Sequence, residues 1–252
     1  MQDFNSSNTV VIAGPCAVES IEQMETVCKT LKSTGVRYLR GGCFKPRTSP
    51  HTFRGLGEEG LKIMATMRER YGLRIVTEVR DTKHLDLVAQ YADIVQVGAK
   101  SMYDNDLLLA CGELKKPIVL KRNFAATVKE LVSAAEFITM QGNDQVILCE
   151  RGIRSFENNT RFTLDLCGVA WLKKNAGFPI IVDPSHAMGI AYGIPDLARA
   201  SVAMGIEGLM LEIHPEPGKA LSDAAQQLDM ATFSDLHDSL KPIAKAVNRN
   251  II

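Results

Sequence analysis

The sequence has no excess charge of either sign, because 29 lysines and arginines balance 29 aspartates and glutamates and the pI is about 7.0. Nucleic acids and anionic membranes attract basic proteins, so we expect neither as a partner. Long apolar runs are also missing, and the run Val10–Ala13 is far too short for a membrane span or a signal peptide. We therefore expect a cytoplasmic protein that does not attach to membranes.

Disulfide frameworks, dinucleotide-binding loops and linkers are absent as well. The six cysteines of this 252-residue chain come without a secretion signal, so we expect reduced thiols. No Gly-x-Gly-x-x-Gly motif follows the first predicted strand, which argues against a dinucleotide-binding fold. No low-complexity segment or linker divides the chain. We expect a single domain over residues 1–252.

What the sequence does contain is an alternation of short apolar runs with longer segments of helical periodicity. The runs predict strands at Thr9–Gly14, Tyr38–Phe44, Arg74–Val79, Ile94–Gly98, Pro117–Arg122, Gln145–Glu150, Pro179–Asp183 and Gly208–Ile213. The segments between them predict helices at Ile21–Ser33, Gly57–Tyr71, Lys83–Tyr91, Asp104–Leu114, Ala126–Gln141, Arg161–Lys173, Pro195–Met204 and Ala231–Ala246. Thr160 is the expected cap of the helix that starts at Arg161.

Eight strands that are apolar on both faces, each followed by a helix, predict an α/β protein with a parallel sheet covered by helices. Eight such units close into a (β/α)8 TIM barrel more naturally than they form an open sheet. In this fold the catalytic groups lie at the carboxyl ends of the strands and in the loops after them. Polar residues at those positions are therefore the candidates for a site.

Four residues of types that commonly bind metals occur at or shortly after the strand ends. Cys16 follows the first strand, His186 follows the seventh, Glu212 lies in the eighth, and Asp223 comes soon after it. We expect them to converge on the barrel axis. A thiolate, an imidazole and two carboxylates suit manganese, iron, zinc or cobalt, and the sequence does not choose among these metals. His214 is the alternative to His186. We favour His186, because the DPSH motif that contains it runs from the end of the seventh strand into a loop.

Cationic side chains gather at the same strand ends, namely Lys45, Arg47, Lys121, Arg122, Arg151 and Arg154. Like charges crowded into one small cavity are costly unless an anion balances them. Arginine binds phosphate and carboxylate bidentately, whereas lysine acts as a compact charge. The set predicts one doubly anionic substrate or two anionic substrates. We expect one or two of these cations to point outward or to pair with Glu150 or Asp183.

The motifs GPCAVES, RGGCFKPRTSP, VTEVRD, KPIVLKR, CERGIRSFE, IIVDPSHAMG and LEIHPEPGKALSD resemble those of 3-deoxy-D-arabino-heptulosonate 7-phosphate (DAHP) synthases. The resemblance covers nearly the whole chain and points to the branch related to 3-deoxy-manno-octulosonate 8-phosphate synthases. It implies metal-dependent condensation of phosphoenolpyruvate with erythrose 4-phosphate, the first step of the shikimate pathway to aromatic amino acids. The segment Lys45-Pro46-Arg47-Thr48 is typical of DAHP synthases, whereas octulosonate synthases carry Lys-Ala-Asn-Arg and use arabinose 5-phosphate.

The resemblance also implies roles for individual residues. It assigns phosphoenolpyruvate binding to Arg40, Lys45, Lys100, Lys121 and Arg151, and erythrose 4-phosphate binding to Arg47 and Thr48. It assigns the divalent metal to Cys16, His186, Glu212 and Asp223, with manganese expected first and iron, cobalt or zinc as alternatives. In the implied reaction Lys45 donates a proton to the aldehyde, and Glu150 or His186 accepts the protons of water.

Two positions depart from the family pattern. Lys100 stands where the family usually has the arginine of Gly-Ala-Arg, so a single ammonium replaces a bidentate fork. Asn123 stands where a glycine is common. We expect weaker phosphoenolpyruvate binding than in a typical member, or a paralogue that takes another phosphorylated aldose such as arabinose 5-phosphate. A catalytically silent barrel is disfavoured, because the four metal ligands and the key lysines are present.

The resemblance further predicts how the chain is organised and assembled. Many relatives carry a regulatory or chorismate mutase domain, and we expect none in this chain. Relatives commonly form dimers or tetramers, so we expect a homodimer or a homotetramer. The apolar stretch from Met102 to Leu109 and the outer helices are the surfaces expected to support it.

Overall fold

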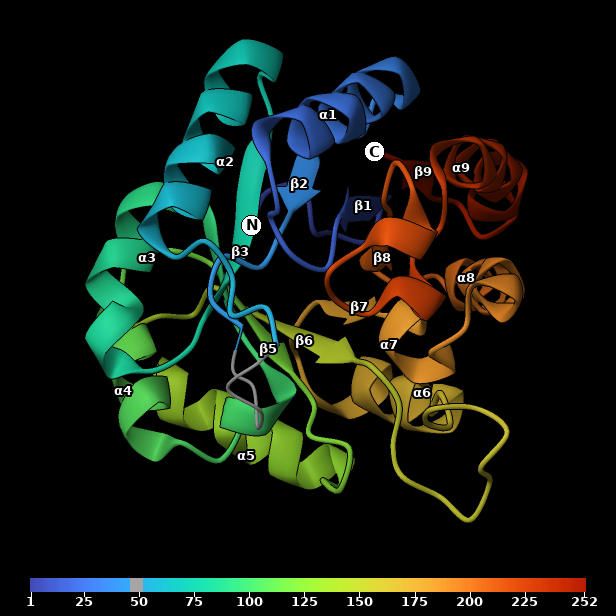
Figure 1. Cartoon of the computed structure of the whole chain (residues 1–252). Helices are drawn as coiled ribbons and strands as arrows, with labels where there is room; N and C mark the ends of the chain where they lie inside the picture. Colours follow the sequence, from blue (N-terminus) through green and yellow to red (C-terminus); the bar gives the residue numbers. More distant parts are fainter. Residues whose placement is uncertain (46–51) are drawn as a thin grey trace.

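Eight parallel strands close into a barrel in this computed structural model, which describes residues 1–45 and 52–252. The strands are β1 (Asn8–Gly14), β2 (Tyr38–Arg40), β3 (Arg74–Val79), β4 (Ile94–Val97), β5 (Ile118–Lys121), β6 (Val146–Glu150), β7 (Ile180–Val182) and β8 (Gly208–Glu212). The barrel closes because β1 pairs with both β2 and β8. A short strand, β9 (Asn250–Ile251), pairs with the start of β1. The predicted (β/α)8 barrel is confirmed (Figure 1).

Helices follow the strands and surround the barrel (Figure 1). They are α1 (Ile21–Thr34), α2 (Glu58–Tyr71), α3 (Leu85–Tyr91), α4 (Asn105–Glu113), α5 (Val128–Thr139), α6 (Leu166–Asn175), α8 (Ile194–Ala203) and α9 (Met230–Ala246). A short helix that was not predicted, α7 (Pro184–Met188), directly follows β7. In the described part of the chain, no helix is long and apolar enough to cross a membrane.

Local sequence determines where the first two helices begin and end. Ser20 caps α1, because its side chain accepts a hydrogen bond from the backbone N–H of Gln23. Gly35 ends α1 and Gly72 ends α2 in the left-handed conformation, with φ of 82° and 68°. Glycine adopts this conformation without the steric cost that a Cβ imposes, so the chain can turn back toward the next strand.

The predicted end of β2 is wrong. The strand ends at Arg40 rather than at Phe44. Beyond Arg40, Gly42 pairs with Ala17 of the loop after β1 instead of continuing along β3. The two loops that carry Cys16 and Lys45 are therefore joined directly above the barrel.

The predicted start of α6 is also wrong. The helix begins at Leu166 with Asp165 as its cap, so Arg161 and Thr160 lie in the preceding loop. The backbone N–H of Arg161 donates to the carbonyl of Met188 in α7. This tertiary contact holds the loop over the barrel end and prevents an earlier helical start.

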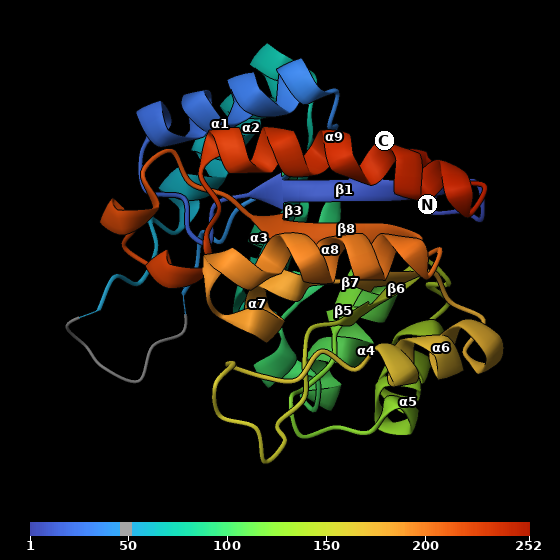
Figure 2. The ribbon, with the colours of Figure 1, turned by 90° about the vertical axis from the view of Figure 1, so that its right-hand side faces the viewer.

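Strand residues point alternately into the barrel and toward the helices, because successive side chains of a strand lie on opposite faces. In β1, Val11 and Ala13 pack in the helix layer, whereas Val10 and Ile12 lie in the interior. The interior cluster also contains Phe4, Tyr38, Val76, Ile94, Val119, Ile147, Cys149, Ile181 and Met210. Both termini lie at the end of the barrel where the strands begin (Figure 2).

The interior becomes polar one step further along the strands. Two residues after an inner apolar side chain come Arg40, Glu78, Gln96, Lys121, Arg151, Asp183 and Glu212. Four charged members of this set, Arg40, Lys121, Asp183 and Glu212, are buried. The fold therefore gathers charged side chains at the carboxyl end of the barrel, where proteins of this architecture carry their sites.

Candidate active site

Three of the predicted metal ligands meet above the barrel interior. Ligand atoms of Cys16, Glu212 and Asp223 all lie within 4.8 Å of one another. Cys16 Sγ donates to Asp223 Oδ2 at 3.1 Å. The three residues come from the loop after β1, the end of β8 and the loop before α9, so the closure of the barrel between β1 and β8 brings them together.

His186 borders this group of three. Asp183 holds the imidazole, because its Oδ2 lies 2.7 Å from Nδ1 of His186. The other ring nitrogen, Nε2, lies 3.5 Å from Glu212 Oε1. A carboxylate on one ring nitrogen and a metal on the other is a common arrangement for a ligating histidine. The alternative, His214, lies against Glu19 instead, so the geometry favours His186.

The chemistry of these four side chains fits a divalent cation. Burial and the nearby Glu212 raise the pKa of the Cys16 thiol to about 12. Burial opposes the ionisation of Glu212, but His186, Arg40 and Lys45 outweigh it and lower the pKa of that carboxyl to about 2. A bound cation would favour the thiolate form of Cys16, as metal coordination does for thiols in general. The mixed sulfur, nitrogen and oxygen ligands suit manganese, iron, zinc or cobalt.

Two buried guanidinium groups at the site have unused hydrogen-bonding capacity. Arg40 Nη1 donates to Glu212 Oε1 at 2.6 Å and to the carbonyl of Pro15 at 2.9 Å. Arg40 Nε and Arg151 Nη1 have no hydrogen-bond partner among the described residues. Burial lowers the pKa of Arg151, which shows how poorly its surroundings solvate the charge. A buried donor without a partner is costly, so an anionic ligand that accepts from both groups would stabilise them.

A cavity of about 350 Å³ opens beside these groups at the carboxyl end of the strands. The cations that line it are Lys45, Arg80, Lys100, Arg151 and Arg161. His186 and Asp223 line the same cavity, so the candidate metal site and the cations share one space. Lys45 Nζ donates to Cys16 Sγ at 2.9 Å. Burial opposes the charge on Lys45, yet the nearby Cys16 and Glu212 raise its pKa, so the ammonium form persists at neutral pH.

Three of the six predicted cations do not face the cavity freely. Lys121 Nζ lies 2.5 Å from Asp183 Oδ2, in a fully buried pair. Arg122 pairs with Glu150 and with Asp165, each at 2.8 Å. Arg154 is exposed and stacks over the ring of Phe124. The expectation that one or two cations would be paired or turned outward therefore underestimated their number.

Glu150 does not line the cavity. Its strand neighbour Leu148 packs in the helix layer, and a residue two positions on shares that outward face. Glu150 Oε2 accepts from Arg122, and Oε1 accepts from the backbone N–H of Gly152 at 2.7 Å. These contacts position the segment that follows Arg151. Arg47 and Thr48, predicted to bind erythrose 4-phosphate, lie outside the described residues.

Two adjacent glutamines contact the candidate metal ligands. Their only signal in the sequence is their place shortly after Asp223. Gln226 Nε2 donates to Glu212 Oε2 at 2.6 Å, and Gln226 Oε1 accepts from Arg161 at 2.7 Å. Gln227 Oε1 accepts from the backbone N–H of Cys16 at 3.0 Å. Both glutamines are buried, so Gln226 fixes the orientation of the Glu212 side chain and Gln227 fixes the backbone at Cys16. Arg161 was also missed, because it was predicted to be the first residue of a helix.

Comparison with known proteins identifies the family. Residues 5–249 match the model of the DAHP synthetase I family. The chain is 46% identical over 237 residues to phospho-2-dehydro-3-deoxyheptonate aldolase of Thermotoga maritima, an alignment that covers 94% of this chain and 70% of the relative. This chain belongs to the DAHP synthetase I family.

Solved structures agree with this assignment. The crystal structure of the Thermotoga maritima DAHP synthase matches with a TM-score of 0.95 at 45% identity, covering 98% of this chain and 72% of that one. A truncated form of that synthase matches with a TM-score of 0.92 at 42% identity, covering 98% of this chain and 90% of that one. A 2-dehydro-3-deoxyphosphooctonate aldolase of Stenotrophomonas maltophilia is 34% identical, with 91% of this chain and 89% of the relative covered. The resemblance to both branches is confirmed.

We predict that Asp183→Asn destabilises the metal-free protein by about 3–5 kcal/mol at neutral pH, because it leaves the buried ammonium of Lys121 without a counter-ion. Burial raises the pKa of Asp183, but His186 and Lys121 lower it well below 3.8. A carboxylate with a depressed pKa stabilises the fold above its unfolded value, and this contribution is lost as the pH falls further. The difference between wild type and variant should therefore shrink below about pH 3.8.

Denaturant unfolding at neutral and acidic pH measures this difference. Asp196→Asn is the matched control, because Asp196 is 86% exposed in its pair with Arg199 and should contribute little. An Asp183→Asn variant as stable as wild type at neutral pH would contradict the role of this pair.

Proposed function

We propose that this chain condenses phosphoenolpyruvate with erythrose 4-phosphate and water to give DAHP and inorganic phosphate, in a metal-dependent reaction that begins the shikimate pathway. The observation that carries the proposal is a cavity lined by cations together with His186 and Asp223, two members of the candidate metal-binding set. The other two members, Cys16 and Glu212, adjoin Asp223. Phosphoenolpyruvate carries a phosphate and a carboxylate, and the acceptor carries a second phosphate. The five cations that line the cavity outnumber its acidic residues Glu78, Asp81 and Asp223, and this excess of positive charge suits anionic substrates.

Cys16, His186, Glu212 and Asp223 are the residues that would hold the divalent cation, with manganese proposed first. When bound, the cation supplies Lewis-acid polarisation of the acceptor aldehyde. Lys45 adds a proton donor in the same place, because its ammonium lies 2.9 Å from Cys16 Sγ. We propose that Lys45 donates this proton to the aldehyde oxygen as it becomes a hydroxyl.

We propose that Arg40, Lys45, Lys100, Lys121 and Arg151 bind phosphoenolpyruvate, the donor, and hold its double bond against the aldehyde carbon. Arg40 Nε and Arg151 Nη1, which have no hydrogen-bond partner in the described part of the chain, support the assignment of these two arginines. The third carbon of the donor forms the new bond, and positive charge develops at its second carbon. Water adds there, and the resulting hemiketal expels inorganic phosphate. His186 or Glu150 was predicted to accept the protons of water. Glu150 does not line the cavity, and His186 would have Nδ1 on Asp183 and Nε2 on the cation, so we assign this role to neither residue.

The acceptor sugar follows from the segment Lys45-Pro46-Arg47-Thr48, in which we propose that Arg47 and Thr48 bind the phosphate of erythrose 4-phosphate. The similarity to the Stenotrophomonas maltophilia aldolase, whose product is named as a phosphooctonate, supports a second candidate reaction. In that reaction arabinose 5-phosphate replaces erythrose 4-phosphate, and the chemistry at the cavity is unchanged.

We predict that the purified chain with manganese releases phosphate from phosphoenolpyruvate when erythrose 4-phosphate is supplied, and not with arabinose 5-phosphate or ribose 5-phosphate. A chelator should abolish the release and added manganese should restore it, because the acceptor aldehyde then regains its polarisation. A colorimetric phosphate assay run with the three sugars in parallel measures this. Phosphate release with arabinose 5-phosphate alone would show that this sugar is the acceptor. Full activity in the chelated protein would refute metal dependence.

Lys100→Arg should lower the KM for phosphoenolpyruvate about fivefold, because an additional charge-assisted hydrogen bond to the phosphate contributes about 1 kcal/mol or more. Lys100 is exposed and lines the cavity, so the larger guanidinium has room. Initial rates at varied phosphoenolpyruvate concentrations give the KM. Lys129→Arg on the exposed face of α5 is the control, and an unchanged KM in Lys100→Arg would refute the assignment.

We also propose that the chain assembles as a homodimer or a homotetramer. The predicted surface from Met102 to Leu109 does not support this, because Met102, Leu107 and Leu108 are buried. Tyr192, in the segment between α7 and α8, is 74% exposed and offers apolar surface instead. Light scattering of the purified chain should give two or four times the 27.6 kDa monomer mass, whereas the monomer mass would contradict the proposal.

A further inference from the structure

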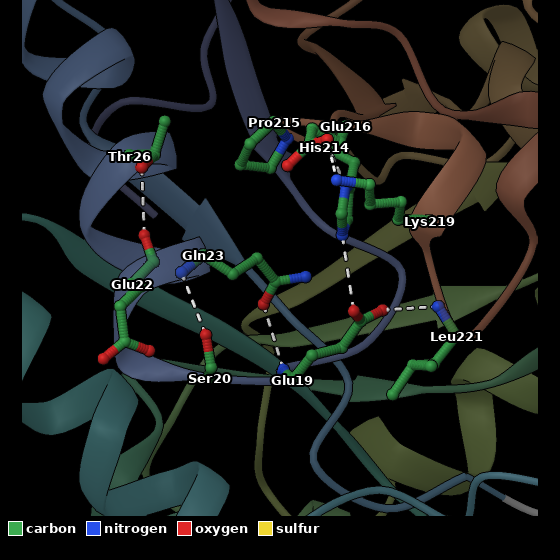
Figure 3. Close-up of a pocket in the computed structure, with 10 residues that line it drawn as sticks. All are labelled: Glu19, Ser20, Glu22, Gln23, Thr26, His214, Pro215, Glu216, Lys219 and Leu221. Atoms are coloured by element: carbon green, nitrogen blue, oxygen red, sulfur yellow. Dashed lines mark hydrogen bonds and ion pairs between the residues drawn. The ribbon is translucent and has the colours of Figure 1, made fainter.

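Glu19 connects the loop after β1 to the loop between β8 and α9. It lies three residues after Cys16 and lines a cavity of about 390 Å³ outside the barrel mouth (Figure 3). His214 and Leu221 of the second loop line the same cavity. The side chain of Glu19 is only 12% exposed and that of His214 only 7%, so their contact is largely shielded from solvent.

Each carboxylate oxygen of Glu19 faces a different point of the second loop (Figure 3). Oε1 accepts from the backbone N–H of Leu221 at 2.9 Å. Oε2 lies 3.4 Å from Nε2 of His214. The backbone N–H of Glu19 donates to Gln23 Oε1 at 3.0 Å, which ties Glu19 to the first turn of α1. Glu19 is therefore fixed from α1 and reaches across to two points of the neighbouring loop.

The hydrogen bonds of His214 determine its tautomer. Nδ1 accepts from the backbone N–H of Glu216 at 3.0 Å, so this nitrogen carries no proton. The proton of the ring then lies on Nε2, which donates to Glu19 Oε2. Glu19 and His214 together hold the loop at residues 214, 216 and 221.

The held segment leads directly into two groups that contact the thiol of Cys16. Ser222 Oγ and Asp223 Oδ2 lie 3.2 Å and 3.1 Å from Cys16 Sγ. Asp223 has φ 51° and ψ 38°, in the left-handed region, which aspartate enters more readily than most residues with a Cβ. The bond from Glu19 to Leu221 lies two residues before Asp223, so it restrains the backbone that leads to this conformation.

We propose that Glu19 is a positioning residue that sets Asp223 against Cys16 and thereby tunes the affinity of the site for its divalent cation. The proposal rests on the metal-dependent function proposed above. Glu19 itself touches none of the reacting groups. Its effect passes through the backbone of the loop, in the way that groups behind metal ligands commonly control affinity.

Glu19→Gln tests the proposal with little change in size. In glutamine an NH2 group replaces one of the two carboxylate oxygens, so a donor then faces either the N–H of Leu221 or the Nε2–H of His214, and one of the two contacts is lost. Titration of the purified, metal-free chain with Mn²⁺ alone should show roughly 10- to 100-fold weaker binding in the variant. Co²⁺ should give a weaker or shifted thiolate-to-metal absorption band in the variant, because Asp223 is no longer held in a fixed position relative to Cys16.

Glu22→Gln is the matched control. Glu22 lines the same cavity, but its carboxylate points away from His214 and Leu221 (Figure 3). This variant should bind Mn²⁺ as the wild type does. Thermal unfolding of the metal-free variants should show Glu19→Gln still folded at the temperature of the titration, which separates positioning from general destabilisation. His214→Gln, which removes the other half of the contact, should weaken Mn²⁺ binding in the same direction and serves if Glu19→Gln does not fold.

The outcomes distinguish this proposal from the proposed function. If the wild-type chain bound Mn²⁺ and both Glu19→Gln and His214→Gln bound it equally well, the role of Glu19 would be wrong and the metal-dependent function would stand. If the wild-type chain bound neither Mn²⁺ nor Co²⁺, the metal-dependent function would be wrong, and the role of Glu19 with it.

Discussion

Each strand of a closed barrel turns only one face toward the axis, so side chains two residues apart must share the interior. In this chain the inward positions change from apolar to charged at one level, as from Tyr38 to Arg40 in β2 and from Met210 to Glu212 in β8. The apolar level excludes water and stabilises the barrel. The charged level lies directly above it, so the same alternation that builds the core also places the site.

Burial of so many charges is possible because most of them have a partner. Arg40 faces Glu212, and Lys121 faces Asp183. An isolated charge at these positions would be strongly disfavoured, whereas a paired one is tolerated. The exceptions, Arg40 Nε and Arg151 Nη1, mark where the described protein leaves room for an acceptor from a ligand. The buried carboxylates Glu212 and Asp183 therefore have cationic partners, whereas Arg40 and Arg151 keep hydrogen-bond donors for an anionic substrate.

The strands and the candidate metal ligands were predictable from the sequence because both depend on short-range rules. Apolar runs identify strands, and a polar residue at a strand end must lie at the barrel mouth, as Cys16 and Glu212 do. Contacts made by loops were not predictable. The start of α6 depends on a bond from Arg161 to α7, and the positions of Gln226 and Gln227 depend on the path of the loop before α9.

The sulfur of Cys16 and the carboxylate of Asp223 meet across 207 positions of the sequence. In the folded chain, the pairing of β1 with β8 brings together the segments that carry them. Contacts between such distant segments form late, because closing a long loop costs entropy before the contact repays it. During synthesis, the cluster of Cys16, Glu212 and Asp223 therefore stays unformed until the last barrel strand has emerged and closed the ring. Cation affinity would thus serve as a marker of completed folding.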